Sequence, residues 1–206
     1  LFALKEFGNI YSRIGNPTVG ALEARLTALE DGAMCVALSS GTSAVMYSLI
    51  NIMSQGDNFI SASQLYGGTY TMFDNILPEY GINAKKVDIT DFKAVEESID
   101  DKTRAIYCET ITNPGLVVAD ISALSEIAHS NGIPLIVDAT FTTSAIQKSF
   151  DFGADIVVYS LTKWMSGHGR VIAGAVIEKG GFDWGNGNFP LFDKPDTSYG
   201  GMRWGH

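Results

Sequence analysis

Short runs of apolar, often β-branched residues alternate with helix-like segments along nearly the whole of this 206-residue chain. Glycine, asparagine, aspartate and hydroxyl residues separate the runs, as expected of buried strands joined by helices. The strands are expected at residues 34–38, 58–62, 82–87, 104–108, 133–137, 154–159 and 171–177. This alternation predicts an α/β fold, with a mainly parallel sheet and helices on both faces.

Residue types that cap helix ends mark several helix boundaries. The Asn16–Pro17 pair is suited to the cap and first residue of a helix that runs to about Glu30. Asp120 is suited to cap a later helix, which the Asn131–Gly132 pair would end. Further helices are expected at about residues 42–53, 69–77 and 91–99.

The chain has a formal net charge of −9 and a pI of about 4.7. This charge argues against nucleic acid or an anionic membrane surface as a partner. No apolar run reaches membrane-spanning length and no signal peptide precedes Leu1, so we expect a cytoplasmic protein. Cys35 and Cys108 lie in apolar runs without CxxC spacing, and we expect them to be buried structural thiols. The isolated histidines predict no metal site.

Polar residues follow several of the expected strands, at the carboxyl ends where parallel sheets usually bind ligands. In open sheets of this kind the ligand lies outside the carboxyl ends of the strands. The residues concerned are Gly41, Thr42, Tyr66, Asn113, Asp138 and Lys163. We therefore expect them to meet at one edge of the sheet.

Most of these residues allow two interpretations, a role in ligand binding or catalysis and an ordinary structural role. The small residues 39–44, between a strand and a helix start, can hold a phosphate or form a plain capped turn. Lys163, expected beside the core rather than open water, can be an amine nucleophile or a surface lysine. Tyr66 can stack on a ligand ring or pack as an ordinary aromatic. Asp138, after a continuous apolar run, is expected to be at least half buried with a cationic or N–H partner.

One ligand would use all of these groups together, namely pyridoxal 5′-phosphate. Lys163 would bond covalently to its aldehyde, and Asp138 would keep the ring nitrogen protonated so that the ring accepts electron density. Tyr66 would stack on the ring face. The phosphate oxygens would bind Gly41, Thr42, Ser160 and Thr162.

Several short motifs keep a family-like order and spacing along the chain. They are Tyr11–Thr18, Ser39–Ala44, Leu65–Thr69, Glu109–Pro114, Val137–Phe141 and Ser160–Lys163. Together they resemble the Cys/Met-metabolism family of pyridoxal-phosphate enzymes, a fold-type I family with cystathionine γ-synthase, γ-lyases and O-acetylhomoserine sulfhydrylase among its members. The segment 181–199 resembles the sulfhydrylase subgroup more than the lyases.

The resemblance implies a division of the chain and a shared active site. Residues 1–17 would be an arm that contacts a partner subunit, 18–180 the cofactor-binding large domain and 181–206 a loop-rich connection. Tyr11 and Arg13 would reach the cofactor phosphate of the neighbouring subunit in a homodimer or homotetramer, because the planar guanidinium donates two hydrogen bonds to a phosphate.

The resemblance also implies that Asn113 lies near the cofactor and the carboxylate of an amino-acid substrate. The chain departs from the family pattern at Ala139, where asparagine is usual, and at Arg170, where a small hydroxyl residue is usual. The family's carboxyl-terminal domain, with the arginine that holds the substrate carboxylate, is not found in these residues. We therefore expect a fragment of such an enzyme.

The predicted function is γ-replacement on an O-acyl-homoserine with sulfide or a thiol, which gives homocysteine or a related product. The freed amine of Lys163 would move a proton between carbons, with Tyr66 placed to assist. The alternatives are γ-lyase or cystathionine γ-synthase activity, and a cofactor-binding dimerisation unit without catalysis.

Two further classes lack their partner motifs. Residues 160–163 also fit the S-x-x-K pattern of serine acyl enzymes, but neither SDN nor KTG occurs in the chain. A dinucleotide-binding module would need a G-x-G-x-x-G motif, and a nucleoside triphosphate site would need a P-loop. Neither motif is present in the chain.

Overall fold

The described part of the chain, residues 8–205 of a computed structural model, contains one mixed sheet. Its strand order is β1-β7-β6-β5-β4-β2-β3, and parallel pairing joins the strands from β6 to β3. Only β7 runs against its neighbours, β6 and β1. The strands are β1 (Met34–Leu38), β2 (Asn58–Ala62), β3 (Asn83–Val87), β4 (Thr103–Glu109), β5 (Leu135–Asp138), β6 (Ile156–Ser160) and β7 (Gly174–Glu178). The predicted mainly parallel sheet is confirmed.

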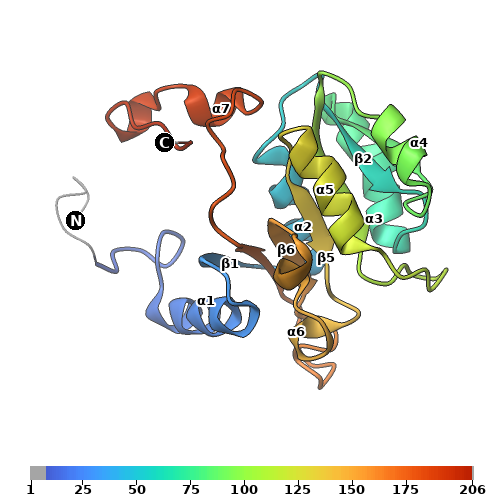
Figure 1. Cartoon of the computed structure of the whole chain (residues 1–206). Helices are drawn as coiled ribbons and strands as arrows, with labels where there is room; N and C mark the ends of the chain where they lie inside the picture. Colours follow the sequence, from blue (N-terminus) through green and yellow to red (C-terminus); the bar gives the residue numbers. More distant parts are fainter. Residues whose placement is uncertain (1–7, 206) are drawn as a thin grey trace.

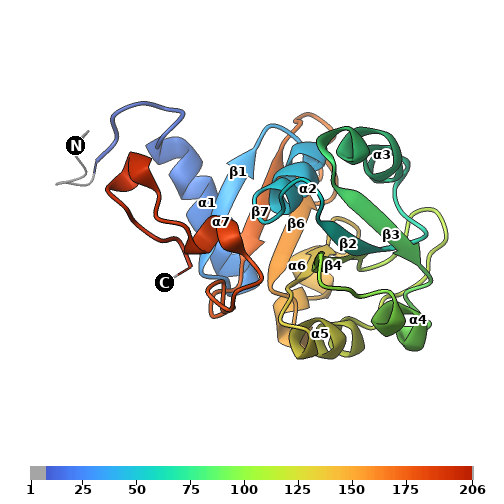
Figure 2. The same ribbon diagram turned by 90° about the horizontal axis from the view of Figure 1, so that it is seen from above.

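Helices cover both faces of this sheet, as predicted (Figures 1 and 2). On one face α2 packs on β6 and β7 and also touches α3, while on the other α1 packs on β1 and α5 on β5. The helices are α1 (Pro17–Glu30), α2 (Gly41–Ile50), α3 (Gly67–Thr71), α4 (Phe92–Glu97), α5 (Ile121–Ser130), α6 (Thr143–Ile146) and α7 (Pro190–Asp193). None of the helices within residues 8–205 has the length and apolarity needed to cross a bilayer.

Two helix starts form through the caps that the sequence predicts. The side chain of Asn16 accepts hydrogen bonds from the amides of Thr18 and Val19, at 2.9 and 3.4 Å, and Pro17 is the first helical residue of α1. The carboxylate of Asp120 accepts from the Ala123 amide at the start of α5. These caps satisfy amides that have no partner inside the helix.

Among the predicted elements that differ from the observed ones are a helix and a strand. The helix expected up to residue 77 is instead α3 followed by a π-helical turn (Met72–Ile76) and a 3-10 turn (Leu77–Tyr80), because Pro78 has no N–H to continue an α-helix. The strand expected from residue 171 begins only at Gly174. Its neighbours β1 and β6 both end opposite Gly174, so the preceding residues have no strand to pair with.

The apolar stripe of α1 is only partly buried. Leu26 is buried, whereas Val19 and Leu22 are each 42% exposed. Because α1 lies beside the edge strand β1 and packs mainly on β1 and β7, only one side of the helix meets the sheet. The periodicity correctly predicted the helix but not how much of its apolar surface is covered.

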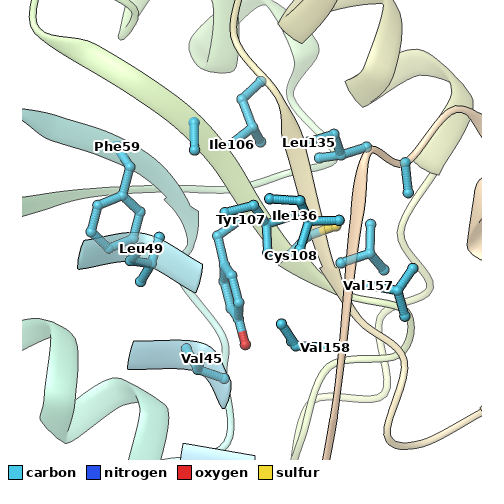
Figure 3. Packing of buried hydrophobic residues seen from close by; sticks show 14 of the residues in the cluster. Val45, Leu49, Phe59, Ile106, Tyr107, Cys108, Leu135, Ile136, Val157 and Val158 are labelled. Carbon is cyan, nitrogen blue, oxygen red and sulfur yellow. The ribbon is translucent and has the colours of Figure 1, made fainter. Parts of the chain in front are cut away.

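The core lies between the sheet and its helices, and it includes buried aromatic rings. The ring of Phe73 meets Phe59 and Tyr107 edge to face, with centroids 4.8 and 5.2 Å apart. Figure 3 shows Tyr107 within this cluster. Cys35 and Cys108 are buried and unpaired, as predicted, and burial raises the pKa of each thiol to about 12. Both are therefore neutral packing groups.

The last segment, residues 181–205, is rich in loops but carries an aromatic cluster. Phe189 is fully buried, and the rings of Trp184 and Phe192 stack with centroids 5.2 Å apart. The side-chain amide of Asn188 donates to the carbonyl of Gly132, which ties the segment to the end of α5. These contacts attach the segment to the sheet domain.

Candidate active site at the carboxyl ends of the strands

The parallel strands bring their carboxyl ends to one edge of the sheet. Strands β2, β4, β5 and β6 are parallel, and β1 shares their direction because β7 runs against both β1 and β6. Leu38 and Ser160, the last residues of β1 and β6, are both register partners of Gly174. Residues 39–42, 63–66, 110–113 and 161–163 therefore all leave the sheet at this edge, which Asp138 also occupies.

The start of α2 packs directly on the end of β6. A side chain on Gly41 would place its Cβ 2.7 Å from Cα of Ser160 and 2.9 Å from its hydroxyl oxygen, so only glycine fits. Ser40 caps the helix by accepting from the Ser43 amide at 3.1 Å. The amides of Gly41 and Thr42 precede the first intrahelical hydrogen bonds and find no acceptor among the described residues. Two free amides and the positive end of the helix dipole thus lie beside the Ser160 hydroxyl, an arrangement that suits a phosphate.

Thr162, the fourth residue predicted to bind phosphate, already uses its hydroxyl. This group donates to the carbonyl of Ala173 at 3.2 Å and accepts from the Ala173 amide at 3.1 Å. Its single proton is therefore not available to a phosphate in this conformation. Instead the hydroxyl closes the turn between β6 and β7.

Asp138 ends β5 and is half buried, with the N–H partner that the sequence predicts. Its Oδ1 accepts from the Thr140 amide at 2.9 Å, and its Oδ2 accepts from the hydroxyl of Tyr107 at 3.3 Å. Burial raises the pKa of the carboxyl. No lysine, arginine or histidine of the described residues forms an ion pair with Asp138, so a cationic ring nitrogen would supply the missing partner.

Tyr107 was missed by the sequence analysis. Its side chain is fully buried, and register pairing with Ile136 places it on the same face of the sheet as Asp138. A buried tyrosine hydroxyl requires a hydrogen-bond partner. The available signal was a tyrosine within the short run Ala105–Cys108, two residues before the end of β4.

Tyr66 and Asn113 are exposed at this edge and share a partner that was also missed. The carboxylate of Glu109 accepts from the amide of Tyr66 at 2.7 Å and from the amide of Asn113 at 2.9 Å. Glu109 is only 5% exposed. Burial raises the pKa of Glu109 to about 7, and the negative charge of Asp138 contributes to the rise, while the two amides oppose it.

Lys163 lies in the turn after β6, where its amide donates to the carbonyl of Ser160 at 3.1 Å. Its side chain is exposed, so the prediction that it lies beside the core rather than open water was wrong. The chain turns away from the sheet after Ser160, and the adjacent Trp164 is 66% exposed. The amine is therefore accessible to a ligand that arrives at the edge.

Tyr11 and Arg13 lie in the turn before α1 and contact each other. The guanidinium carbon is 5.5 Å from the centroid of the tyrosine ring, and Tyr11 is 59% exposed. Neither residue contacts the edge residues within the described part of the chain. Their role in a neighbouring subunit's site stays a prediction, and residues 1–7 of the predicted arm lie outside the described residues.

Two surface hollows lie away from this edge. One, of about 280 Å³, is lined by Asp100 and Arg104 at the amino end of β4, and the other, of about 390 Å³, lies between α1 and β1. The predicted site is instead an open surface, since Thr42, Tyr66, Asn113 and Lys163 are all exposed.

The edge fits pyridoxal phosphate on the chemistry of its groups. The Gly41 and Thr42 amides with the Ser160 hydroxyl match a phosphate dianion. The carboxyl of Asp138, which lacks a cation, matches a protonated ring nitrogen, and the amine of Lys163 matches an aldehyde. Among the residues of this edge Thr162 departs from the predicted set, and Tyr11 and Arg13 do not contact the edge within the described part of the chain.

The sequence matches the family described as Cys/Met metabolism PLP-dependent enzyme over residues 1–193. It is 46% identical to an O-acetyl-L-homoserine sulfhydrylase of Leptospira meyeri over 98% of this chain. A solved structure of a putative O-acetylhomoserine (thiol)-lyase from Campylobacter jejuni, which carries a pyridoxyl-lysine, is 39% identical and superposes over 99% of this chain with a TM-score of 0.95. A cystathionine γ-lyase structure from Lactobacillus plantarum is also 39% identical and covers 86% of the chain with a TM-score of 0.81.

The chain spans about half the length of these relatives. It covers 46% of the Leptospira protein, 51% of the Campylobacter structure and 46% of the Lactobacillus structure. The similarity extends over nearly all of the present chain.

Proposed function

Because the chain belongs to the Cys/Met metabolism family of PLP-dependent enzymes, we propose that its protein catalyses γ-replacement on an O-acyl-homoserine with sulfide or a thiol. The product would be homocysteine or a close relative. The observation that carries the proposal is the contact between Gly41 and Ser160, which would form a phosphate-binding corner on the same edge of the sheet as Asp138. The similarity to O-acetylhomoserine sulfhydrylases supports the substrate class.

The residues of the edge would divide the work of binding the cofactor. The amides of Gly41 and Thr42 and the hydroxyl of Ser160 donate to the phosphate. Asp138 would keep the ring nitrogen protonated, and the Tyr107 hydroxyl and Thr140 amide, which donate to this carboxylate, would orient it. Tyr66 stacks on the ring. Pyridoxal phosphate, when bound, supplies a ring that accepts electron density from the substrate's α-carbon.

Lys163 would carry the proton that moves between carbons of the substrate. Its amine would hold the cofactor covalently, and once freed it would accept the proton from the α-carbon of the substrate and deliver it at the neighbouring carbons. Tyr66 would assist proton transfer near the γ-carbon, where the acyloxy group leaves as a carboxylate. The Glu109 carboxylate accepts from the backbone amides of both Tyr66 and Asn113, so these two residues lie close together. Asn113 would therefore be near enough to the Tyr66 loop to bind the substrate carboxylate.

The protein would act in the cytoplasm as a homodimer or homotetramer. The exposed apolar side chains of α1 and the preceding turn, among them Ile14, Val19 and Leu22, offer a surface for a second copy. Tyr11 and Arg13 beside this surface would bind the cofactor phosphate of that copy. The unpaired Cys35 and Cys108 suit a reducing compartment.

Borohydride reduction of the native protein with pyridoxal phosphate tests the cofactor assignment. We expect a stable pyridoxyl adduct on the peptide that contains Lys163, detected by mass spectrometry, and no adduct there in Lys163→Ala. An adduct confined to other lysines would overturn the proposal. Turnover of O-acetylhomoserine with sulfide to homocysteine tests the reaction, and a protein that binds the cofactor without turnover would be the non-catalytic alternative.

A γ-lyase is the second candidate, because a cystathionine γ-lyase structure has the same 39% identity to this chain as the thiol-lyase structure. Both reactions share their early steps, so the same residues would serve. The products differ: a γ-lyase releases a 2-oxo acid and ammonia. Measurement of ammonia against homocysteine with O-acetylhomoserine and sulfide separates the two.

A further inference from the structure

Glu109 joins two loops of the proposed active site through one buried carboxylate. Its Oε1 accepts from the amide of Tyr66, 43 residues away in sequence, and its Oε2 accepts from the amide of Asn113. We propose that Glu109 is a positioning residue that fixes the loops of Tyr66 and Asn113 relative to each other, so that ring stacking and carboxylate binding occur in one geometry. This inference rests on the proposed function of the site.

The strand order makes this link possible. Strands β2 and β4 are parallel neighbours, so the loops that follow them leave the sheet side by side. A Cβ on Gly115 would lie 2.7 Å from the side-chain Cδ of Gln64, which shows how closely the two loops pack. Glu109 ends β4 directly between them. No hydrogen bond between the backbones of residues 63–66 and 112–115 is found in the described structure, so the carboxylate is their polar connection.

The link requires a carboxylate rather than a carboxylic acid. An ionised carboxylate can accept both amides, whereas a protonated one carries a hydroxyl and accepts fully at only one oxygen. The titratable groups near Glu109 are Asp138 on β5 and the buried Tyr107 on β4, which lie on the same face of the sheet, and the adjacent Cys108, which lies on the opposite face. No basic side chain of the described residues forms an ion pair with Glu109. Because burial and Asp138 raise the pKa of Glu109 to about 7, protonation weakens the link as the pH falls through neutrality.

This placement also couples Glu109 to the cofactor. Glu109 and Asp138 are register partners on neighbouring parallel strands, so their side chains leave the sheet on the same face. A cationic ring nitrogen at Asp138 would offset the negative charge that opposes ionisation of Glu109. Cofactor binding therefore favours the form of Glu109 that holds both loops.

Hydrogen–deuterium exchange of Glu109→Gln tests the link without the cofactor. At pH 8 we expect the segments with residues 65–68 and 112–114 to exchange at least tenfold faster than in the wild type, with the strands unchanged. In the wild type, protection of both segments relative to the intrinsic rate should fall as the pH is lowered from 8 to 6, and the variant should lack this dependence. Equal exchange in both proteins would overturn the proposal. Glu126→Gln on the exposed surface of α5 removes the same charge and serves as the control.

Measurement of KM for the amino-acid substrate and of cofactor affinity in the native protein completes the test. We expect Glu109→Gln to raise KM about tenfold or more and to weaken pyridoxal phosphate binding, because both loops lose their geometry. Faster exchange with unchanged KM and cofactor affinity would assign Glu109 a purely structural role and overturn the proposal. If Glu109→Gln fails to fold, Glu109→Asp keeps the charge with a shorter reach and should show the same losses. A wild-type protein that binds no pyridoxal phosphate overturns the proposed function first, and the positioning role falls with it.

Discussion

Gly41 lies directly against Ser160, so the amino end of α2 and the carboxyl end of β6 meet without an intervening side chain. The contact joins residues that are far apart in the chain, and it brings two free amides of a helix start to a hydroxyl at a strand end. A helix start alone is common. Its meeting with the end of the strand that precedes Lys163 is what suits this corner to the phosphate of a cofactor that would also bind the lysine.

Gly41→Ala should weaken cofactor binding at least tenfold and destabilise the protein by about 1–3 kcal/mol, because the added methyl overlaps the Ser160 backbone and forces α2 or β6 to shift. Titration by visible absorbance and urea unfolding measure the two effects. Gly20→Ala on α1 is the matched control, since its methyl would meet nothing within 4 Å. It should stabilise the protein by about 0.5–1 kcal/mol. Wild-type cofactor affinity in Gly41→Ala would contradict the phosphate corner.

The variants Ser160→Ala and Thr162→Val should distinguish a role in cofactor binding from a role in the stability of the fold. Ser160 has no described hydrogen-bond partner for its hydroxyl, so its loss should weaken cofactor binding several-fold and leave stability nearly unchanged. Thr162 joins its hydroxyl to the backbone of Ala173, so Thr162→Val should cost about 1–2 kcal/mol of stability. Urea unfolding and cofactor titration of both variants make the comparison. If Thr162→Val instead weakened cofactor binding and left stability unchanged, Thr162 would be a phosphate-binding residue.

Tyr107→Phe should raise the pKa of Asp138 further, because the tyrosine hydroxyl donates to the ionised carboxylate and stabilises it. We expect cofactor affinity to fall about tenfold, and to fall more at lower pH than at higher pH, because the variant favours the protonated form of Asp138. Cofactor titrations between pH 6 and 9 measure the change. Tyr80→Phe, at a tyrosine that is 59% exposed, is the control. An affinity that falls equally at every pH would show that Tyr107 acts through packing alone.

Glu109 should make the protein less stable as the pH rises from about 4.5 to about 7. Burial raises its pKa in the folded state to about 7 from the ordinary 4.5, so the folded protein binds a proton that the unfolded chain releases. Stability that is present below pH 4.5 is therefore lost through this window, by at most about 3 kcal/mol. Urea unfolding of wild type and Glu109→Gln across this range measures the difference between them. Parallel pH curves for the two proteins would contradict the assignment.

The alternation of strands and helices and several helix boundaries were predictable because they depend on neighbouring residues. Residue periodicity reports which side of an element is apolar, and the caps at Asn16 and Asp120 act within one turn of helix. The same local patterns placed polar residues at strand ends. General knowledge of parallel sheets then predicted that these ends share an edge.

The sequence alone thus determined the elements, the direction of the sheet and the edge where its chemistry gathers. Only the tertiary structure decided which groups meet there, because strand order and side-chain contacts join segments that are distant along the chain. Glu109 joins Tyr66 to Asn113 because β2 lies beside β4, and Tyr107 reaches Asp138 because β4 lies beside β5. Burial by those long-range contacts, which no local pattern encodes, also raises the pKa of both carboxyls.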